Sequence, residues 1–213
     1  MADNFGRVVF NEQKAMAYLS GEITEQTAQD INGFFLKVFS NSYVQTPPIL
    51  IIDSNGGDVD AFMSMYDTLS MLPPIYRVVT GKACSGACWL TLSGQVGFRF
   101  AMPHSYMMLH SMSYGLVGKH EDISNTVQEY ARQQGLLNQI IIHHTNITKT
   151  EVEEKFGKGD WYMTPKEALQ KGVIDAIVNP NLLGQLFGAQ VADVVEQPVK
   201  RPEKPKGKTK SKK

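Results

Sequence analysis

A serine in a turn of small residues is the first feature of the sequence that could carry chemistry. Ser85 lies in the segment Gly-Lys-Ala-Cys-Ser-Gly-Ala at 81–87, between a predicted strand and a predicted helix. Small neighbours let a substrate carbonyl approach the hydroxyl, and backbone N–H groups at the start of a helix can bind the oxyanion that forms. The segment departs from the usual Gly-x-Ser-x-Gly pattern, so by itself it fits a tightly packed turn equally well.

A nucleophilic serine needs a base, and His110 is the best placed of the five histidines. It ends the apolar segment 106–109 and precedes a glycine-containing loop, where a sheet presents a side chain at its rim. His104 follows a proline and fits a turn, and the other three histidines lie on or beside a predicted long helix. A lone histidine at a strand end is more often structural, so His110 needs partners to carry a role.

Asp160 and two glycines are the remaining candidates. Asp160 follows the Gly-Lys-Gly turn at 157–159, and its carboxylate could fix the tautomer of an imidazole; the alternative is an Asx turn. Gly56-Gly57 follows a buried strand and is therefore predicted at the carboxyl edge of the sheet, where sites form in α/β folds. Their N–H groups could complete an oxyanion hole or align an extended substrate, or form a plain turn.

The elements that must position these residues alternate between strands and helices, which predicts an α/β domain. Strands are predicted at 15–19, 49–52, 76–80, 96–101, 106–109 and 173–178, with Ser20-Gly21 ending the first and a turn at 53–57. Helices are predicted at 24–39, 59–69, 88–92 and 120–144, and capping boxes begin at Thr148 and Thr164. The 120–144 helix is longer than average, so we expect it to project and pair.

Composition predicts an ordinary globular protein. The 213 residues are 42% hydrophobic and 20% charged, which fits a domain at 15–180 between a short segment at 1–14 and an extension at 181–213. No stretch resembles a signal peptide or a membrane span, so we expect a cytoplasmic protein without a membrane partner. Cys84 and Cys88 are expected as buried packing groups, and no metal or cofactor is implied.

The basic end of the chain is the one strong charge asymmetry. Residues 200–213 hold eight Lys or Arg against the single Glu203, while the whole chain has a formal charge of zero. The segment contains prolines and a glycine and no aromatic residue. We therefore expect a solvated, disordered tail and no nucleic-acid partner.

Taken together, the segments resemble the proteolytic subunit of the Clp protease (ClpP), a serine peptidase family with a crotonase-like fold. The resemblance runs from about Met16 to Val178. The segments that carry it are Ser-Asn-Gly-Gly-Asp-Val at 54–59, Tyr-Asp-Thr at 66–68, Ala-Cys-Ser at 83–85, Arg-Phe-Ala-Met-Pro-His-Ser at 99–105, Met-Leu-His at 108–110, Glu-Ala at 167–168 and Gly-Val-Ile-Asp at 172–175. As an ordered set they are specific, although each piece alone is not.

The resemblance implies a catalytic triad of Ser85, His110 and Asp160, with the N–H groups of Gly57 and Gly86 as the oxyanion hole. It further implies that the long helix is the handle that pairs two heptameric rings of a homo-oligomer, a tetradecamer with the sites inside. Unfolded polypeptides would be delivered by an AAA+ unfoldase such as a Clp ATPase. The sequence departs from the family at Asn55, where the family has proline, at Gly86, where it has methionine, and at 111–112, where it has Gln-Pro.

Three other readings remain open from the sequence. The first is a non-catalytic structural subunit of a mixed ring. The second is a dedicated protease of the same family type, for example one for viral capsid maturation. The third is a crotonase-type acyl-CoA enzyme, because that fold also uses glycine N–H groups to hold an oxyanion. The acyl-CoA chemistry would not need Ser85.

Overall fold

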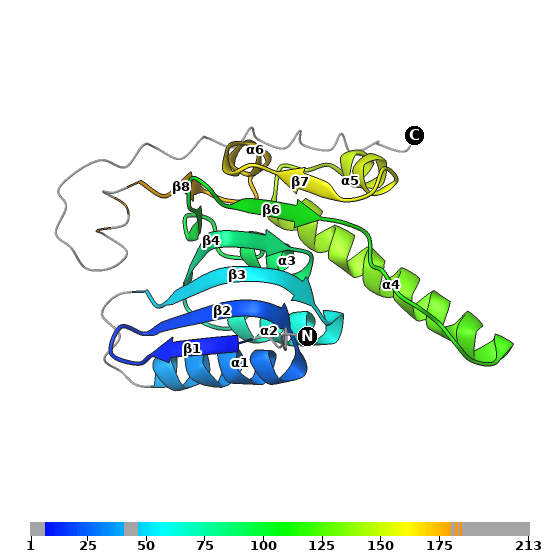
Figure 1. Cartoon of the computed structure of the whole chain (residues 1–213), viewed down its shortest axis with the longest axis horizontal. Helices are drawn as coiled ribbons and strands as arrows, with labels where there is room; N and C mark the ends of the chain where they lie inside the picture. The colour runs from blue at the N-terminus through cyan, green and yellow to red at the C-terminus, as the bar shows by residue number, and fades with distance from the viewer. Residues whose placement is uncertain (1–6, 41–46, 180–181, 183, 185–213) are drawn as a thin grey trace, which may run out of the picture.

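The computed structural model of the chain describes residues 7–40, 47–179, 182 and 184 (Figure 1). The predicted basic tail at 200–213, nearly all of the 181–213 extension and the first six residues of the 1–14 segment lie outside the described residues. No helix in the described part of the chain is long and apolar enough to cross a bilayer.

Within the described residues, eight strands form one mixed sheet in the order β1-β2-β3-β4-β5-β8, and β6 pairs with both β4 and β7. The strands are β1 (Arg7–Asn11), β2 (Met16–Ile23), β3 (Ile49–Gly57), β4 (Tyr76–Cys84), β5 (Arg99–Ala101), β6 (Tyr106–Leu109), β7 (Trp161–Met163) and β8 (Ala176–Ile177). The pairs β1-β2 and β6-β7 are antiparallel, and the other pairs are parallel. The parallel centre means that several strands end at the same edge of the sheet.

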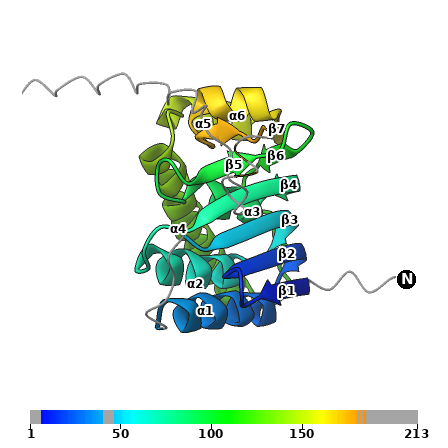
Figure 2. The same cartoon turned by 90° about the vertical axis from the view of Figure 1, so that its left-hand side faces the viewer.

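The helices pack mainly against one face of this sheet (Figure 2). They are α1 (Glu25–Ser40), α2 (Val59–Ser70), α3 (Gly86–Leu92), α4 (His120–His144), α5 (Lys149–Phe156) and α6 (Pro165–Lys171). The short helix α3 follows β4 directly and is buried along its whole length. The alternation of these helices with parallel strands confirms the predicted α/β fold.

The core follows from the period of two along the strands. Leu50 and Ile52 of β3 point to the face covered by the helices, where they join the main apolar cluster. Ile49 points to the opposite face and packs with Val78 and Phe100 in a second, smaller cluster. Strands buried on both faces need continuous apolar runs, which explains the uninterrupted Ile-Leu-Ile-Ile sequence at 49–52.

The long helix α4 has the predicted bounds and projects away from the sheet (Figure 1). Its buried residues, Leu137, Ile140 and Ile141, all lie in the second half. The first half therefore does not pack against the hydrophobic core. There the ring of Tyr130 packs on Tyr114 of the preceding loop, with ring centroids 4.5 Å apart. The apolar stripe therefore anchors only the base of the helix.

Several predicted strand ends are wrong, and the errors have one cause. The strand predicted at 15–19 continues to Ile23, the strand at 49–52 runs through the predicted turn to Gly57, and the strand at 76–80 runs to Cys84. Gly, Ser and Asp residues at these ends are typical of turns. Hydrogen bonds to neighbouring strands keep the backbone extended. A register shift between Gly21 and Glu22 accommodates the irregular pairing of β2 with β3.

The remaining differences concern short elements. The predicted strands at 96–101 and 173–178 are limited to Arg99–Ala101 and Ala176–Ile177, and the helix predicted from residue 88 begins at Gly86. The strands β1 and β7 were not predicted. Thr164 makes the complete predicted capping box with Glu167, whereas at Thr148 the structure shows only the half in which the Thr148 side chain accepts from the Glu151 N–H.

Candidate active site

Ser85 occupies a sharp turn between β4 and α3. Its backbone has φ 50° and ψ −131°, a conformation that costs a non-glycine residue about 1–3 kcal/mol. The Ser85 N–H donates to the Met108 carbonyl at 2.8 Å, and the Ser85 carbonyl accepts from Cys88 N at 2.8 Å and Trp89 N at 3.2 Å. Contacts with β6 and α3 therefore fix the strained turn and the direction of the hydroxyl.

Gly56 is the backbone against which the serine turn packs. A Cβ at Gly56 would lie 2.6 Å from the Cys84 carbonyl oxygen and 2.7 Å from Ser85 Cβ, and its φ is +88°. Real Cβ atoms do not approach so closely, and other residues rarely adopt this conformation. The first of the two adjacent glycines is therefore needed for the close contact between the end of β3 and the turn that holds Ser85.

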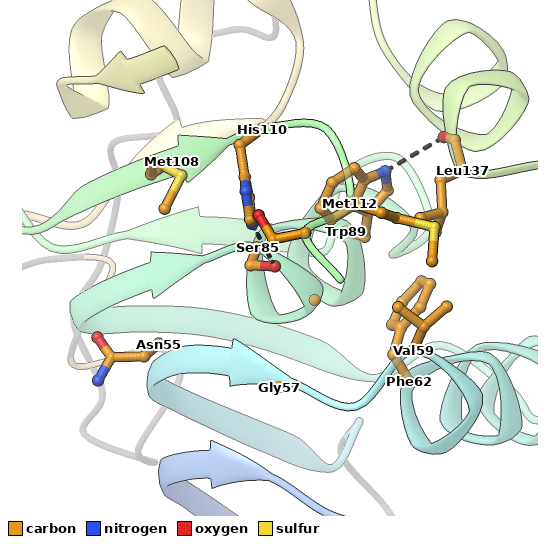
Figure 3. A pocket seen from close by; sticks show the side chains of 12 residues that line it. Asn55, Gly57, Val59, Phe62, Ser85, Trp89, Met108, His110, Met112 and Leu137 are labelled. Atoms are coloured by element: carbon orange, nitrogen blue, oxygen red, sulfur yellow. Dashed lines mark hydrogen bonds between the residues drawn. The ribbon is translucent and has the colours of Figure 1, made fainter. Parts of the chain in front are cut away.

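His110 lies within hydrogen-bond distance of Ser85 (Figure 3). β6 runs parallel to β4 with Cys84 opposite Met108, so the residues that follow the two strands emerge side by side. The distance from His110 Nε2 to Ser85 Oγ is 2.8 Å. With the imidazole proton on Nδ1, the hydroxyl donates to Nε2, which is the arrangement that a general base requires.

Asp160 lies on the other side of the imidazole. β6 and β7 are antiparallel with Leu109 opposite Trp161, so the register places Asp160 directly across from His110. Asp160 Oδ1 is 4.0 Å from His110 Nδ1, which is within ion-pair distance but too long for a hydrogen bond. The Asp160 side chain is 50% exposed. The structure thus brings the three predicted residues together, with one tight contact and one loose one.

Gly57 and Gly86 lie next to each other beside Ser85. Gly57 ends β3 and Gly86 begins α3, and the position of a Cβ on Gly86 is 3.8 Å from Gly57 N. The first N–H groups of a helix have no partner within it, so the Gly86 N–H can bind a ligand. A side chain on Gly57 would clash with the Ile23 carbonyl oxygen. Both residues predicted for the oxyanion hole therefore border Ser85.

A cavity of about 290 Å³ opens beside the hydroxyl of Ser85. Figure 3 shows five apolar side chains gathered on one side of Ser85 and Asn55 on the other; the five are Val59, Phe62, Trp89, Met112 and Leu137. Ser85, His110, Gly57 and Gly86 also line it. The Trp89 indole N–H donates to the Leu137 carbonyl at 3.2 Å, which ties α3 to the base of α4. The cavity is therefore built from distant segments.

The two cysteines beside Ser85 are both free and buried, which confirms the prediction for them. Burial raises the pKa of the Cys84 thiol and raises that of Cys88 even more. Both thiols are therefore protonated at neutral pH, and only a thiolate is a strong nucleophile. Ser85 is the residue of this turn that is available for attack.

Sequence reasoning missed the cavity. Val59 and Phe62 have a spacing that indicates only the helix predicted at 59–69, and Met112 and Leu137 belong to a loop and to α4. No local pattern marks residues that come together from three separate segments. Of the other histidines, His144 lies away from Ser85, with its Nε2 3.2 Å from the Tyr66 hydroxyl.

A family model described as Clp protease matches residues 5–181. The match covers most of the chain and includes Ser85, His110, Asp160 and both glycines of the site.

Proposed function

The chain belongs to the Clp protease family, and from this premise we propose that it is a serine endopeptidase in which Ser85 attacks the peptide carbonyl, His110 is the general base and Asp160 orients the imidazole. The observation that carries the proposal is the 2.8 Å distance between Ser85 Oγ and His110 Nε2. An unassisted hydroxyl is a poor nucleophile at neutral pH, so this contact is what the reaction needs first.

The proposed reaction proceeds in two halves. His110 Nε2 takes the Ser85 proton as Oγ bonds to the carbonyl carbon, and the N–H groups of Gly57 and Gly86 hold the oxyanion. His110 then gives this proton to the leaving amine as the C–N bond breaks, which leaves an acyl-enzyme. In the second half His110 takes a proton from water, the hydroxide attacks the ester, and the proton returns to Ser85 as the acid product leaves.

Asp160 has its role while the imidazole is charged. Its Oδ1 is 4.0 Å from His110 Nδ1 in the free enzyme, and the attraction between them grows when His110 accepts the serine proton. Contacts in a triad are often long without substrate and shorten as the reaction proceeds. We propose that the carboxylate closes this gap in the transition state and keeps the Nδ1 proton in place.

The cavity supports a preference for an apolar side chain next to the cleaved bond. Its lining contains no Lys, Arg, Asp or Glu, and His110 is the only titratable side chain among the residues that form it. A charged substrate side chain would lose its hydration there without gaining a partner. At about 290 Å³ the cavity is near the lower limit for ligand pockets, so it fits one side chain rather than a larger group.

The setting we propose for this site is the sequestered chamber of a homo-oligomer in the cytoplasm. The exposed half of α4 supports this, because Val127, and Tyr114 and Val117 of the preceding loop, are large apolar residues open to solvent. Exposed apolar groups gathered in one region indicate a protein interface. In this proposal α4 pairs two heptameric rings, and an AAA+ unfoldase feeds unfolded polypeptides to the chamber.

The test uses the full-length purified chain. Fluorogenic peptides with an apolar residue before the scissile bond should be hydrolysed without ATP, and a fluorophosphonate should label Ser85. Ser85→Ala should lower kcat/KM by about 10⁴ or more, while Ser70→Ala, a serine far along α2, should leave it unchanged. The particle mass from native mass spectrometry should correspond to fourteen copies.

Each alternative has its own signature in this experiment. A non-catalytic subunit would give neither hydrolysis nor label, which would overturn the proposal. Turnover of an acyl-CoA thioester that survives Ser85→Ala would favour the crotonase-type reading. Cleavage confined to one defined protein substrate would favour a dedicated processing role over general turnover.

A further inference from the structure

Gly86 is a glycine that the backbone does not require. It begins α3 and is not among the residues with positive φ. A Cβ there would meet Ile23 Cδ1 at 3.4 Å, Phe62 Cβ at 3.6 Å and Gly57 N at 3.8 Å, which are ordinary van der Waals distances. Alanine would therefore fit, and helices favour alanine over glycine.

The other two glycines of the site differ in this respect. Gly56 and Gly57 have φ values of +88° and +153°, and a Cβ on either would collide with backbone atoms. Their identity follows from the fold alone. At Gly86 the backbone does not explain the glycine, so the relevant feature is the space that a side chain would occupy.

That space belongs to the cavity beside Ser85. Gly86 lines it together with Gly57 and Phe62, two of the three residues closest to the absent Cβ. Ile23 and Phe62 are at most 1% exposed and already at contact distance, so they block growth towards the core. Atoms beyond Cβ would have to enter the cavity, whose volume is about 290 Å³.

We propose that Gly86 sets the largest side chain that the cavity admits, and that its missing side chain lets the enzyme cleave after large aromatic residues as well as small aliphatic ones. The inference rests on the proposed function. The aromatic rings of Phe62 and Trp89 and the flexible Met112 border the same space. These side chains favour an aromatic substrate side chain, because rings make edge-to-face contacts with each other and a thioether sulfur makes favourable contacts with a ring.

The experiment compares two peptides that differ only in the residue before the scissile bond, Ala or Phe. Gly86→Ala should lower the Phe/Ala ratio of kcat/KM a few-fold, and Gly86→Leu should lower it at least about tenfold, as filling an apolar pocket does. The ratio is the readout because a change in the Gly86 N–H affects both peptides alike. Gly33→Ala, on α1 with nothing within 4 Å of the new Cβ, is the matched control.

The outcomes separate this inference from the proposed function. If both peptides lose activity equally, Gly86 acts on the nucleophile or the oxyanion and the inference is wrong. An unchanged ratio in both variants, with fluorophosphonate labelling retained, also overturns it. If the wild-type chain cleaves neither peptide and Ser85 takes no label, the proposed function itself fails. Thermal unfolding of each variant shows that the comparison is made on folded protein.

Discussion

The two ends of α3 are held in opposite ways. At the carboxyl end, buried arginines donate to the last carbonyls: Arg77 Nη1 to Leu90 and Arg99 Nη1 to Leu92, the latter at 3.0 Å. At the amino end, Ser85 is the N-cap residue but makes no capping hydrogen bond with its side chain. Its hydroxyl contacts His110 instead. One end of the helix uses its polar groups for the fold, and the other leaves them beside a cavity.

The carboxyl end of α3 is held by a buried arginine that forms an ion pair. Arg99 is 1% exposed, its Nη2 is 2.5 Å from Asp175 Oδ1, and its Nε donates to Asp175 Oδ2 at 2.9 Å. Arg77 has no acidic partner among the described residues, and burial lowers its pKa to about 10. The Arg77 guanidinium is still charged at neutral pH, and the negative end of the α3 dipole stabilises this charge.

This contrast explains how the strained backbone of Ser85 is maintained. A positive φ at Ser85 persists only when the surrounding structure fixes it more firmly than the strain can release it. Helix α3 is fully buried and anchored at its far end, so its first residue cannot relax outwards. We therefore expect changes at the amino end to remove chemistry and changes at the carboxyl end to remove stability.

After Ser85→Ala, the largest effect is expected from Asp160→Asn, which acts on the His110 imidazole beside the amino end of α3. Without the carboxylate the imidazolium loses its partner and the tautomer is no longer fixed, so kcat should fall by about 10³–10⁴. The half-exposed side chain leaves no buried charge behind, and the unfolding midpoint should stay within about 1 °C of wild type. Steady-state kinetics and calorimetry check the two parts, with Asp30→Asn, a partly buried aspartate of α1, as the control. A loss of kcat below tenfold would show that Asp160 has no such role.

A smaller effect, and of the other kind, is expected from Asp175→Asn. The Arg99 charge would remain buried without a countercharge, which costs about 3–5 kcal/mol and should lower the unfolding midpoint by roughly 10 °C. The protein that remains folded should hydrolyse peptides with kcat within about twofold of wild type, because Arg99 does not line the cavity.

Glu129→Gln serves as the control for Asp175→Asn, since it removes the exposed pair with Arg132 and should leave the unfolding midpoint unchanged. If the Asp175→Asn protein that remains folded also loses kcat well beyond twofold, the expected distinction between the two ends of α3 is wrong.

The same contrast explains what could be predicted from the sequence. Residue types and spacing made Ser85, His110 and Asp160 candidates, and only the resemblance to the Clp protease family implied them as a triad. The 25-residue apolar pattern was enough to bound α4. The contact between His110 and Asp160 depends on the register of β6 with β7, and β7 has only three residues, too few for a periodic pattern. The cavity depends on Met112 and Leu137 reaching it from separate segments, which no local pattern reveals.

The smallest effect is expected from reagents aimed at the two thiols that flank Ser85. If the amino end of α3 offers only the serine for attack, iodoacetamide at pH 7.5 should leave peptide hydrolysis unchanged within error, because burial raises the pKa of both Cys84 and Cys88 and keeps them as thiols. Mass spectrometry should find both unmodified until the protein is unfolded. The fluorophosphonate provides the contrast, since it should inactivate the same sample completely. Rapid alkylation with parallel loss of activity would mean that a thiolate is exposed in this turn, and the amino end of α3 would then have to be more open than the buried helix observed here.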